Sequence, residues 1–242
     1  MKNKYFGDTR DLFKYDLILR ITRGVVSIHR FLFIPMLTSD DDSGDGGKTN
    51  YTKARAGTQN EELMSYLKNC VNESRRNIME IKPYFESNGV EICIHKELLI
   101  HKNRRDYFDS IKIEKEFFSN SLVFVDPDNG LEIQRSKEKH FLYREAKDIY
   151  DYTDGNSILM IYQHFPRKNH KEYLCRRANE LKNLTGDLPI YISDNEIIFF
   201  LLTKSGEVKN QLKRTTYGNS CKTERYNRRL RMPVGRKFFI SR

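Results

Sequence analysis

The stretch from Ser121 to Glu132, SLVFVDPDNGLE, narrows the possible folds of this chain sharply. Leu122–Val125 is an unbroken apolar run, which is typical of a strand buried on both faces of a sheet. Pro127 has no backbone donor and disfavours helical geometry at Asp126, so the strand ends there. Open parallel sheets bind ligands at the carboxyl ends of their strands. This stretch therefore predicts a parallel sheet with a ligand site beside the turn.

Helical and strand patterns alternate along the rest of the chain. Apolar spacing predicts helices over 5–22, 59–81, 104–118, 139–152 and 169–184. Pro83 is expected to end the second helix and Gly186 the last. Strands are predicted within 25–37 and over 90–95, 121–126, 157–162, 189–193 and 196–203. The last two strands are close enough to form a hairpin. The alternation predicts an α/β fold with a Rossmann-like, mostly parallel sheet and a C-terminal antiparallel hairpin.

The net charge of +10 is concentrated at one end of the chain. From Lys209 onward, eleven lysines and arginines accompany a single glutamate, so residues 1–208 are neutral overall. Aromatic residues, among them Tyr217 and Tyr226, are interleaved with these cations, a mixture that suits phosphate contact and base stacking. We predict a domain over 1–208 and a basic tail over 209–242 that binds RNA or DNA. A solvated tail, or one docked on the domain, is the alternative.

The cysteines and the hydropathy indicate the compartment. Cys70, Cys93, Cys175 and Cys221 include no close pair, which argues against a zinc ribbon or a disulfide scaffold. Such usage is typical of a reduced, cytoplasmic protein. No apolar run approaches membrane-spanning length, and the first residues have no signal-peptide core, so no membrane association is expected.

Polar residues follow both predicted central strands. Asp126, Asp128 and Asn129 follow the first of these strands, and Gln163 and His164 follow the second. Because the ends of parallel strands meet at one edge of a sheet, we expect these side chains to line one crevice. A polar strand-to-loop turn and a surface histidine are the alternative interpretations.

A glycine-rich segment, SDDDSGDGGKT at 39–49, follows the first predicted strand. Gly44, Gly46 and Gly47 permit backbone geometries and close ligand approach that other residues forbid. The segment matches neither the dinucleotide-binding nor the P-loop pattern. It is therefore either a nucleotide-binding turn or an acidic surface loop.

This order of motifs resembles the class I S-adenosylmethionine-dependent methyltransferases, which have a glycine-rich turn after the first strand, an Asp-Pro turn after the fourth and a closing antiparallel hairpin. Within that class the chain resembles the bacterial large-subunit ribosomal RNA adenine-N6 methyltransferases. Their opening Gly-Asn-x-x-Asp-x-x-Lys-His segment is similar to Gly7–Tyr15, and their Asp-Pro-Pro-Tyr turn to Asp126–Asn129. The likeness spans most of residues 5–205. Uncharacterised bacterial proteins with a Gly-Asp opening and an Asp-Pro-Asp-Asn-Gly turn are also similar.

The resemblance implies S-adenosylmethionine as the cofactor and nucleic-acid adenine-N6 methylation as the reaction. The family's cofactor turn would include Asp42, Gly44, Gly46 and Gly47. Its catalytic turn would consist of Asp126, Pro127, Asp128 and Asn129. Asp126 would accept a hydrogen bond from the target amine.

Substrate contacts follow from the same resemblance and from the strand ends. The opening segment would place Lys14 and Tyr15 over the crevice, and an exposed helix face is the alternative for both. Gln163, His164 and Arg167 complete the expected substrate-binding set.

Three departures from the family pattern are visible. Only one predicted strand, 90–95, lies between the first strand and the central one, where the family usually has two. The aromatic residue that stacks on a flipped adenine is replaced by Asn129. The acid that holds the cofactor ribose is not evident, and Glu91 and Glu97 are candidates by neighbourhood only.

Two other functions are consistent with the sequence. Asp126, Asp128 and Glu132 form an acidic group around a turn, as in a Mg²⁺-dependent nuclease. The altered turn is also compatible with a catalytically inactive nucleic-acid-binding module. A divalent-ion requirement would favour the nuclease, whereas binding of S-adenosylmethionine would favour the methyltransferase.

Overall fold

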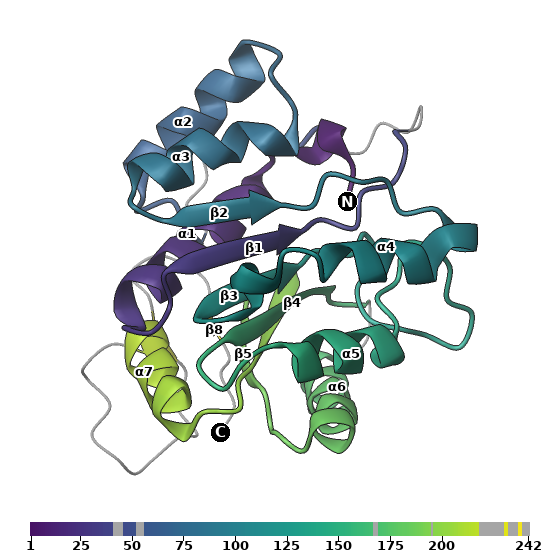
Figure 1. Ribbon diagram of the computed structural model, residues 1–242. Helices are drawn as coiled ribbons and strands as arrows, with labels where there is room; N and C mark the ends of the chain where they lie inside the picture. Colours follow the sequence, from purple (N-terminus) through teal and green to yellow (C-terminus); the bar gives the residue numbers. More distant parts are fainter. Residues whose placement is uncertain are drawn as a thin grey trace.

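The computed structural model describes residues 1–40, 46–51, 56–166, 169–194 and 196–217, and the backbone of 230–231 and 237–238. In these ranges a six-stranded sheet (Figure 1) is formed by β1 Arg30–Ile34, β2 Glu91–Ile94, β3 Ser121–Val125, β4 Ile158–His164, β5 Ile190–Ser193 and β6 Ile197–Leu202. The order is β2-β1-β3-β4-β6-β5. Strands β1 to β4 are parallel, and β6 is antiparallel to β4 and β5. The predicted α/β fold, with its antiparallel hairpin, is confirmed.

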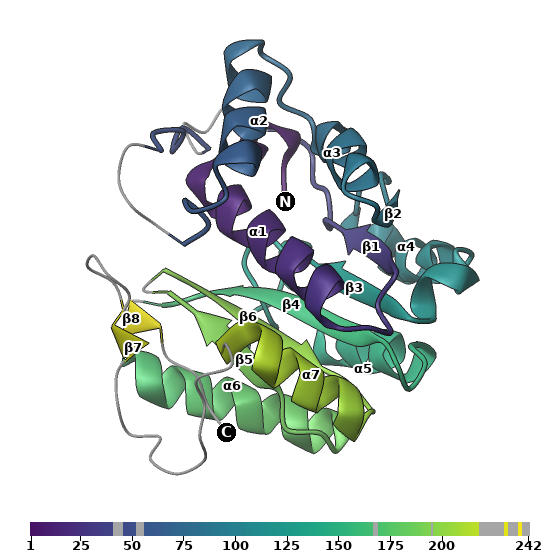
Figure 2. The same cartoon turned by 90° about the vertical axis from the view of Figure 1, so that its left-hand side faces the viewer.

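Helices cover both faces of this sheet. The helices are α1 Thr9–Gly24, α2 Glu61–Asn72, α3 Ile81–Ser87, α4 Arg104–Ile111, α5 Tyr143–Tyr152, α6 His170–Thr185 and α7 Gly206–Tyr217. The short elements are η1 Asn3–Tyr5, η2 Ile78–Glu80, η3 His101–Asn103, η4 Lys115–Phe118, β7 Leu230–Arg231 and β8 Lys237–Phe238. Helices α1, α2, α3 and α7 pack on one face, and α4, α5 and α6 on the other (Figures 1 and 2). Among the described helices, none is long and apolar enough to cross a membrane.

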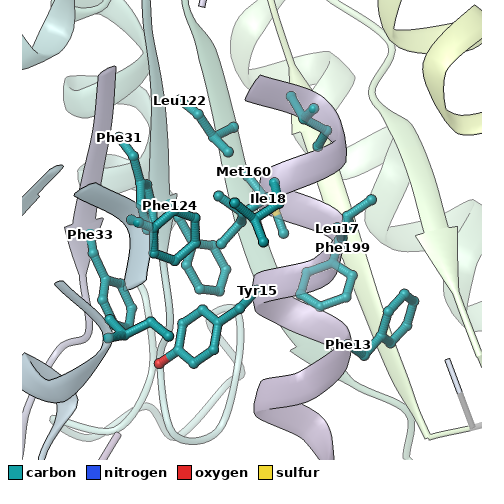
Figure 3. Close-up of a cluster of buried hydrophobic side chains, with 14 of the residues drawn as sticks. Phe13, Tyr15, Leu17, Ile18, Phe31, Phe33, Leu122, Phe124, Met160 and Phe199 are labelled. Carbon is teal, nitrogen blue, oxygen red and sulfur yellow. The ribbon is translucent and has the colours of Figure 1, made fainter. Parts of the chain in front are cut away.

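Strand alternation divides the core into two layers. Phe31 and Phe33 of β1 lie on the α1 side, whereas Leu32 and Ile34 lie on the α4 side. All five residues of β3 are buried, as an unbroken apolar run predicts. Figure 3 shows the α1 side, where side chains from α1 pack against aromatic and aliphatic side chains of β1, β3, β4 and β6.

The predicted helix over 59–81 is wrong, because the chain turns in its middle. Ser74 has a φ of 57°, and the N–H groups of Ser74 and Arg75 donate to the carbonyls of Val71 and Cys70. This is a Schellman cap, in which serine occupies the left-handed position that glycine usually takes. Pro83 does not end a helix, because it lies in the first turn of α3. Backbone N–H groups of a first turn have no partner within the helix, so the N–H that proline lacks is not needed there.

Two other predicted helices are shorter than expected, and the basic segment begins inside a helix. α4 ends at Ile111 before a separate 3₁₀ turn, and α5 begins only at Tyr143. Helix α7 includes the first part of the basic segment and packs against α1. Its Val208 and Leu212 are buried in the core. Residues up to Tyr217 are therefore part of the layered structure.

Candidate functional site

A cavity of about 520 Å³ lies at the carboxyl ends of β3 and β4. Its lining comes from the start of the chain, the loop at 46–48, the turn after β3 and the end of β4: Met1, Tyr5, Asp8, Arg10, Lys14, Gly46, Gly47, Lys48, Asp126, Pro127, Asp128, Asn129, Lys139, Tyr162 and His164. A cavity of this volume is large enough for a small-molecule ligand. It lies at the sheet edge that the sequence predicts as a ligand site.

Asp126 is the buried carboxylate at the centre of this lining. Its N–H donates to Ile34 O at 2.9 Å, which extends the β1–β3 ladder by one residue, and its side chain is 2% exposed. Lys14 Nζ donates to Asp126 Oδ2 at 2.7 Å and also lies 3.1 Å from Asp11 Oδ1. One ammonium group thus lies between two buried carboxylates that are far apart in the sequence.

Burial and charge act against each other in this cluster. Burial raises the pKa of Asp126 above its usual range, although Lys14 opposes the shift. Burial likewise raises the pKa of Asp11 to about 7, against the opposing effect of Lys14. Burial alone would lower the pKa of Lys14, but Asp126 and Asp11 outweigh it and the pKa is raised. Lys14 therefore stays charged, and Asp11 is the carboxyl of this cluster whose pKa lies near neutral pH.

The Gly-Asp opening of the resembling segment positions Lys14 by capping α1. Asp8 accepts hydrogen bonds from the N–H groups of Arg10 and Asp11, at 2.8 and 3.0 Å. Asp11 in turn accepts from the N–H of Gly7, which has a φ of 77°. These contacts satisfy the open donors of the first turn and fix where α1 begins. Lys14, one turn further on, then reaches the end of β3.

The loop at 46–48 is held by the protein itself. Arg76 donates to Gly46 O at 2.7 Å, and Thr9 N–H donates to Lys48 O at 2.9 Å. Gly46 has a φ of 90°, and a Cβ there would lie 2.8 Å from Lys4 O. The glycine is thus required by the packing of its own chain. Gly46 and Gly47 line the cavity, whereas the predicted cofactor residues Asp42 and Gly44 lie outside the described residues.

The whole predicted catalytic turn, 126–129, lines the cavity. Asp128 Oδ2 lies 3.6 Å from Lys139 Nζ, and the N–H of Asn129 donates to Lys139 O at 2.8 Å. Lys139 comes back to the turn because a bridge joins Leu131 to Phe141.

At the end of β4, alternating side chains separate two predicted residues. His164 lines the cavity with Tyr162, two residues earlier on the same strand. Burial, with Arg10 and Lys14 nearby, lowers the pKa of His164 to about 3, so the imidazole is neutral. Gln163 points elsewhere: its Oε1 accepts from the N–H of Leu131 at 2.7 Å.

Two further predicted substrate residues are not part of this cavity as described. Tyr15 is fully buried, and its ring contacts Phe6, Phe33 and Phe85 on the α1 side of the core (Figure 3). Arg167 lies outside the described residues.

Sequence reasoning missed several cavity residues, including Arg10, Lys48, Lys139 and Tyr162. Tyr162 could have been found, because residues two apart on a strand share a face and His164 was already a candidate. Lys48 belongs to the glycine-rich segment at 39–49 and could have been predicted for that reason. Lys139 had no such signal.

The acids of the nuclease hypothesis do not converge. Asp126 and Asp128 line the cavity, but Glu132 accepts a hydrogen bond from the N–H of Tyr143 at 2.8 Å and is not part of the lining. In the part of the chain that the structure describes, no three His, Cys, Asp or Glu side chains are grouped as a metal site.

Fold and cavity together define an α/β protein with a mostly parallel sheet and a polar cavity at the carboxyl edge. Comparison with known protein families, with curated proteins and with solved structures gave no match.

Proposed function

We propose that this protein transfers a methyl group from S-adenosylmethionine to an exocyclic amine of a nucleic-acid base, with adenine N6 as the preferred target. The observation that supports this most is the Asp126 carboxylate. It immediately follows β3, is oriented by Lys14, and borders a cavity whose lining also includes Gly46 and Gly47. A carboxylate at this place can accept a hydrogen bond from an amine and hold the amine in position.

The cavity lining is compatible with the proposed cofactor. Its carboxylates, Asp8, Asp126 and Asp128, can attract a sulfonium and an α-amino group, and they lie beside four cationic side chains of the same lining. Of the two ribose-acid candidates, Glu91 pairs with Arg30 at the start of β2, and the carboxyl edge lies at the other end of that strand. Glu97 accepts from Ser110 and is not part of the lining. Neither candidate is therefore proposed to hold the ribose.

In this mechanism the bound cofactor supplies an activated methyl group, and the protein supplies position and charge. Asp126 accepts a hydrogen bond from the target amine and orients its lone pair. Lys14 holds Asp126 by its contact with Oδ2 and also lies 3.1 Å from Asp11. The neutral His164 adds no cation that would repel a sulfonium. Preorganised electrostatics of this kind commonly account for much of the rate enhancement of enzymes.

No specific observation favours the nuclease or the inactive binding module. The nuclease would need Glu132 in the cavity, where it does not lie. We propose a cytoplasmic location, with which the free thiols of Cys70, Cys93 and Cys175 are compatible.

Binding of S-adenosylmethionine is the first test. Titration calorimetry on the full chain is expected to give a one-site isotherm. Cofactor at about 100 times its Kd is expected to stabilise the fold by about 2.7 kcal/mol. Asp128→Asn, which removes one lining carboxylate, should weaken binding, while the exposed control Lys182→Ala should not. Absence of heat at millimolar cofactor, in protein shown to be folded, would exclude methyl transfer.

The basic C-terminal segment is proposed as a second contact with nucleic acid. Its test is deletion of 218–242, which keeps α7 and the buried Val208 and Leu212. The shortened protein is expected to bind a labelled oligonucleotide more weakly, with a flatter dependence on salt, because phosphate contacts are lost. Unfolding curves of both proteins serve as the control. Equal affinity and equal salt slope would exclude this segment from the interface.

A further inference from the structure

Three half-exposed or exposed cations stand around the cavity where it meets solvent. The side chains of Arg10, Lys48 and Lys139 are 31%, 57% and 34% exposed, in contrast to the buried Lys14 at 7%. All three belong to the lining. They come from α1, the loop at 46–48 and the loop that follows β3, so the fold brings together charges that are distant in sequence.

Each of these cations lies near a carboxylate without a hydrogen bond to it. Arg10 Nε and Lys48 Nζ lie 3.8 and 3.7 Å from the same oxygen, Oε2 of Glu196. Lys139 Nζ lies 3.6 Å from Asp128. These distances exceed the 2.7–3.2 Å that is normal for an N–H···O bond. Within the described part of the chain, Arg10 Nε is buried and has no hydrogen-bond partner.

Two arginines elsewhere in the fold are paired more closely, whereas the exposed Arg105 lies 3.7 Å from Asp109. Arg20 donates to Asp16 at 2.9 Å, and Arg104 makes a two-fold contact with Glu145. The backbones of two cations at the cavity are held by hydrogen bonds, because the carbonyls of Lys48 and Lys139 accept from the N–H groups of Thr9 and Asn129. Their side chains are paired only loosely. Such an arrangement places hydrogen-bond donors where they can bind an anion of a ligand.

We propose that Arg10, Lys48 and Lys139 bind a backbone phosphate of the nucleic acid whose base enters the cavity. This inference rests on the proposed function, since it takes the cavity to be the place where a nucleotide binds. Arginine and lysine are the side chains that most often contact phosphates, and a phosphate offers several acceptor oxygens to converging donors. The cofactor's carboxylate is the competing anion. The exposure of the three cations favours a ligand that arrives from solvent and extends beyond the cavity.

The test is the salt dependence of oligonucleotide binding by the full chain. Fluorescence anisotropy with a labelled twelve-nucleotide single-stranded RNA compares the wild type with the double variant Lys48→Ala/Lys139→Ala. Each lost phosphate contact should lower the slope of log K against log[salt] by about 0.7 on a single strand. Glu196→Gln, which removes the competing carboxylate, should increase affinity. A DNA strand of the same length should show the same change in slope, because phosphates are common to both.

Lys182→Ala is the matched control, because Lys182 is exposed near the end of α6, and no residue of α6 belongs to the cavity lining that the structure describes. If this control changed the slope of log K against log[salt] by the same amount, the change would be due to general surface charge, and the proposal would be overturned. No RNA binding by the wild type, or an unchanged slope in the double variant, would also overturn it.

Two further outcomes separate this proposal from the proposed function. If the double variant bound S-adenosylmethionine more weakly in calorimetry and kept the RNA slope, the cations would be assigned to the cofactor carboxylate. Altered RNA binding in a protein that does not bind the cofactor would refute methyl transfer and leave the phosphate site standing.

Discussion

Replacing Lys14 by methionine is expected to lower the free energy of unfolding by about 3–5 kcal/mol at neutral pH, the usual cost of removing one partner from a buried ion pair. Methionine keeps most of the side-chain volume, so the loss reports charge and not a cavity. It leaves Asp11 and Asp126, which are 1% and 2% exposed, without their cation. Chemical denaturation at pH 7 measures the effect.

The pH dependence of the stability loss in Lys14→Met shows whether the buried charges cause it. A carboxylate whose folded-state pKa is raised binds its proton more tightly when folded, so its contribution to stability falls as pH rises from the unfolded pKa to the folded one. For Asp11 this window runs from 3.8 to about 7. Without Lys14 both carboxylates should hold protons to still higher pH, so the deficit of Lys14→Met should shrink as pH falls.

Two further variants complete this experiment. Lys14→Met/Asp11→Asn should regain part of the lost stability, because one buried charge is then removed. Lys182→Met, on the exposed surface of α6, should change stability by less than about 0.5 kcal/mol. A deficit in Lys14→Met that is independent of pH would mean that packing, and not the charge cluster, is responsible.

Asp126→Asn is expected to reduce methyl transfer by at least about 100-fold, as is typical when one preorganised polar group at the reacting centre is removed. Asparagine keeps the size of the side chain but has only one carbonyl acceptor and no charge. Stability should fall less than in Lys14→Met, because Lys14 keeps Asp11 at 3.1 Å. Transfer of labelled methyl groups to RNA, with unfolding curves in parallel, measures both quantities.

The control for this variant is Asp106→Asn, an exposed aspartate on α4, away from the cavity lining. It should leave transfer unchanged. If Asp126→Asn keeps full transfer, or if its loss of stability equals that of Lys14→Met, Asp126 is a structural carboxylate and the proposed mechanism is wrong.

The order of the six strands of the sheet and the edge that holds the cavity were readable from the sequence, because both follow from local patterns. An unbroken apolar run ending at Asp126-Pro127 is typical of a buried strand that stops there, and β3 does so. The helix predicted within 5–22, with a start near Asp8 or Asp11, was readable from its apolar spacing, and the structure confirms it as α1, Thr9–Gly24. Strand alternation could also have shown that Gln163 and His164 cannot both face one cavity.

The partners of these residues were decided only by the tertiary structure. Lys14 and Asp126 are 112 positions apart, and no local pattern relates them. Lys14 and Tyr15 are neighbours in sequence, yet a helix turns about 100° per residue, so one faces the cavity and the other the core. The burial of Asp126, which is 2% exposed, is likewise a long-range effect, because Lys14 of α1 contacts it. Long-range packing sets which polar group is buried and which cation it meets, and those contacts define the candidate site.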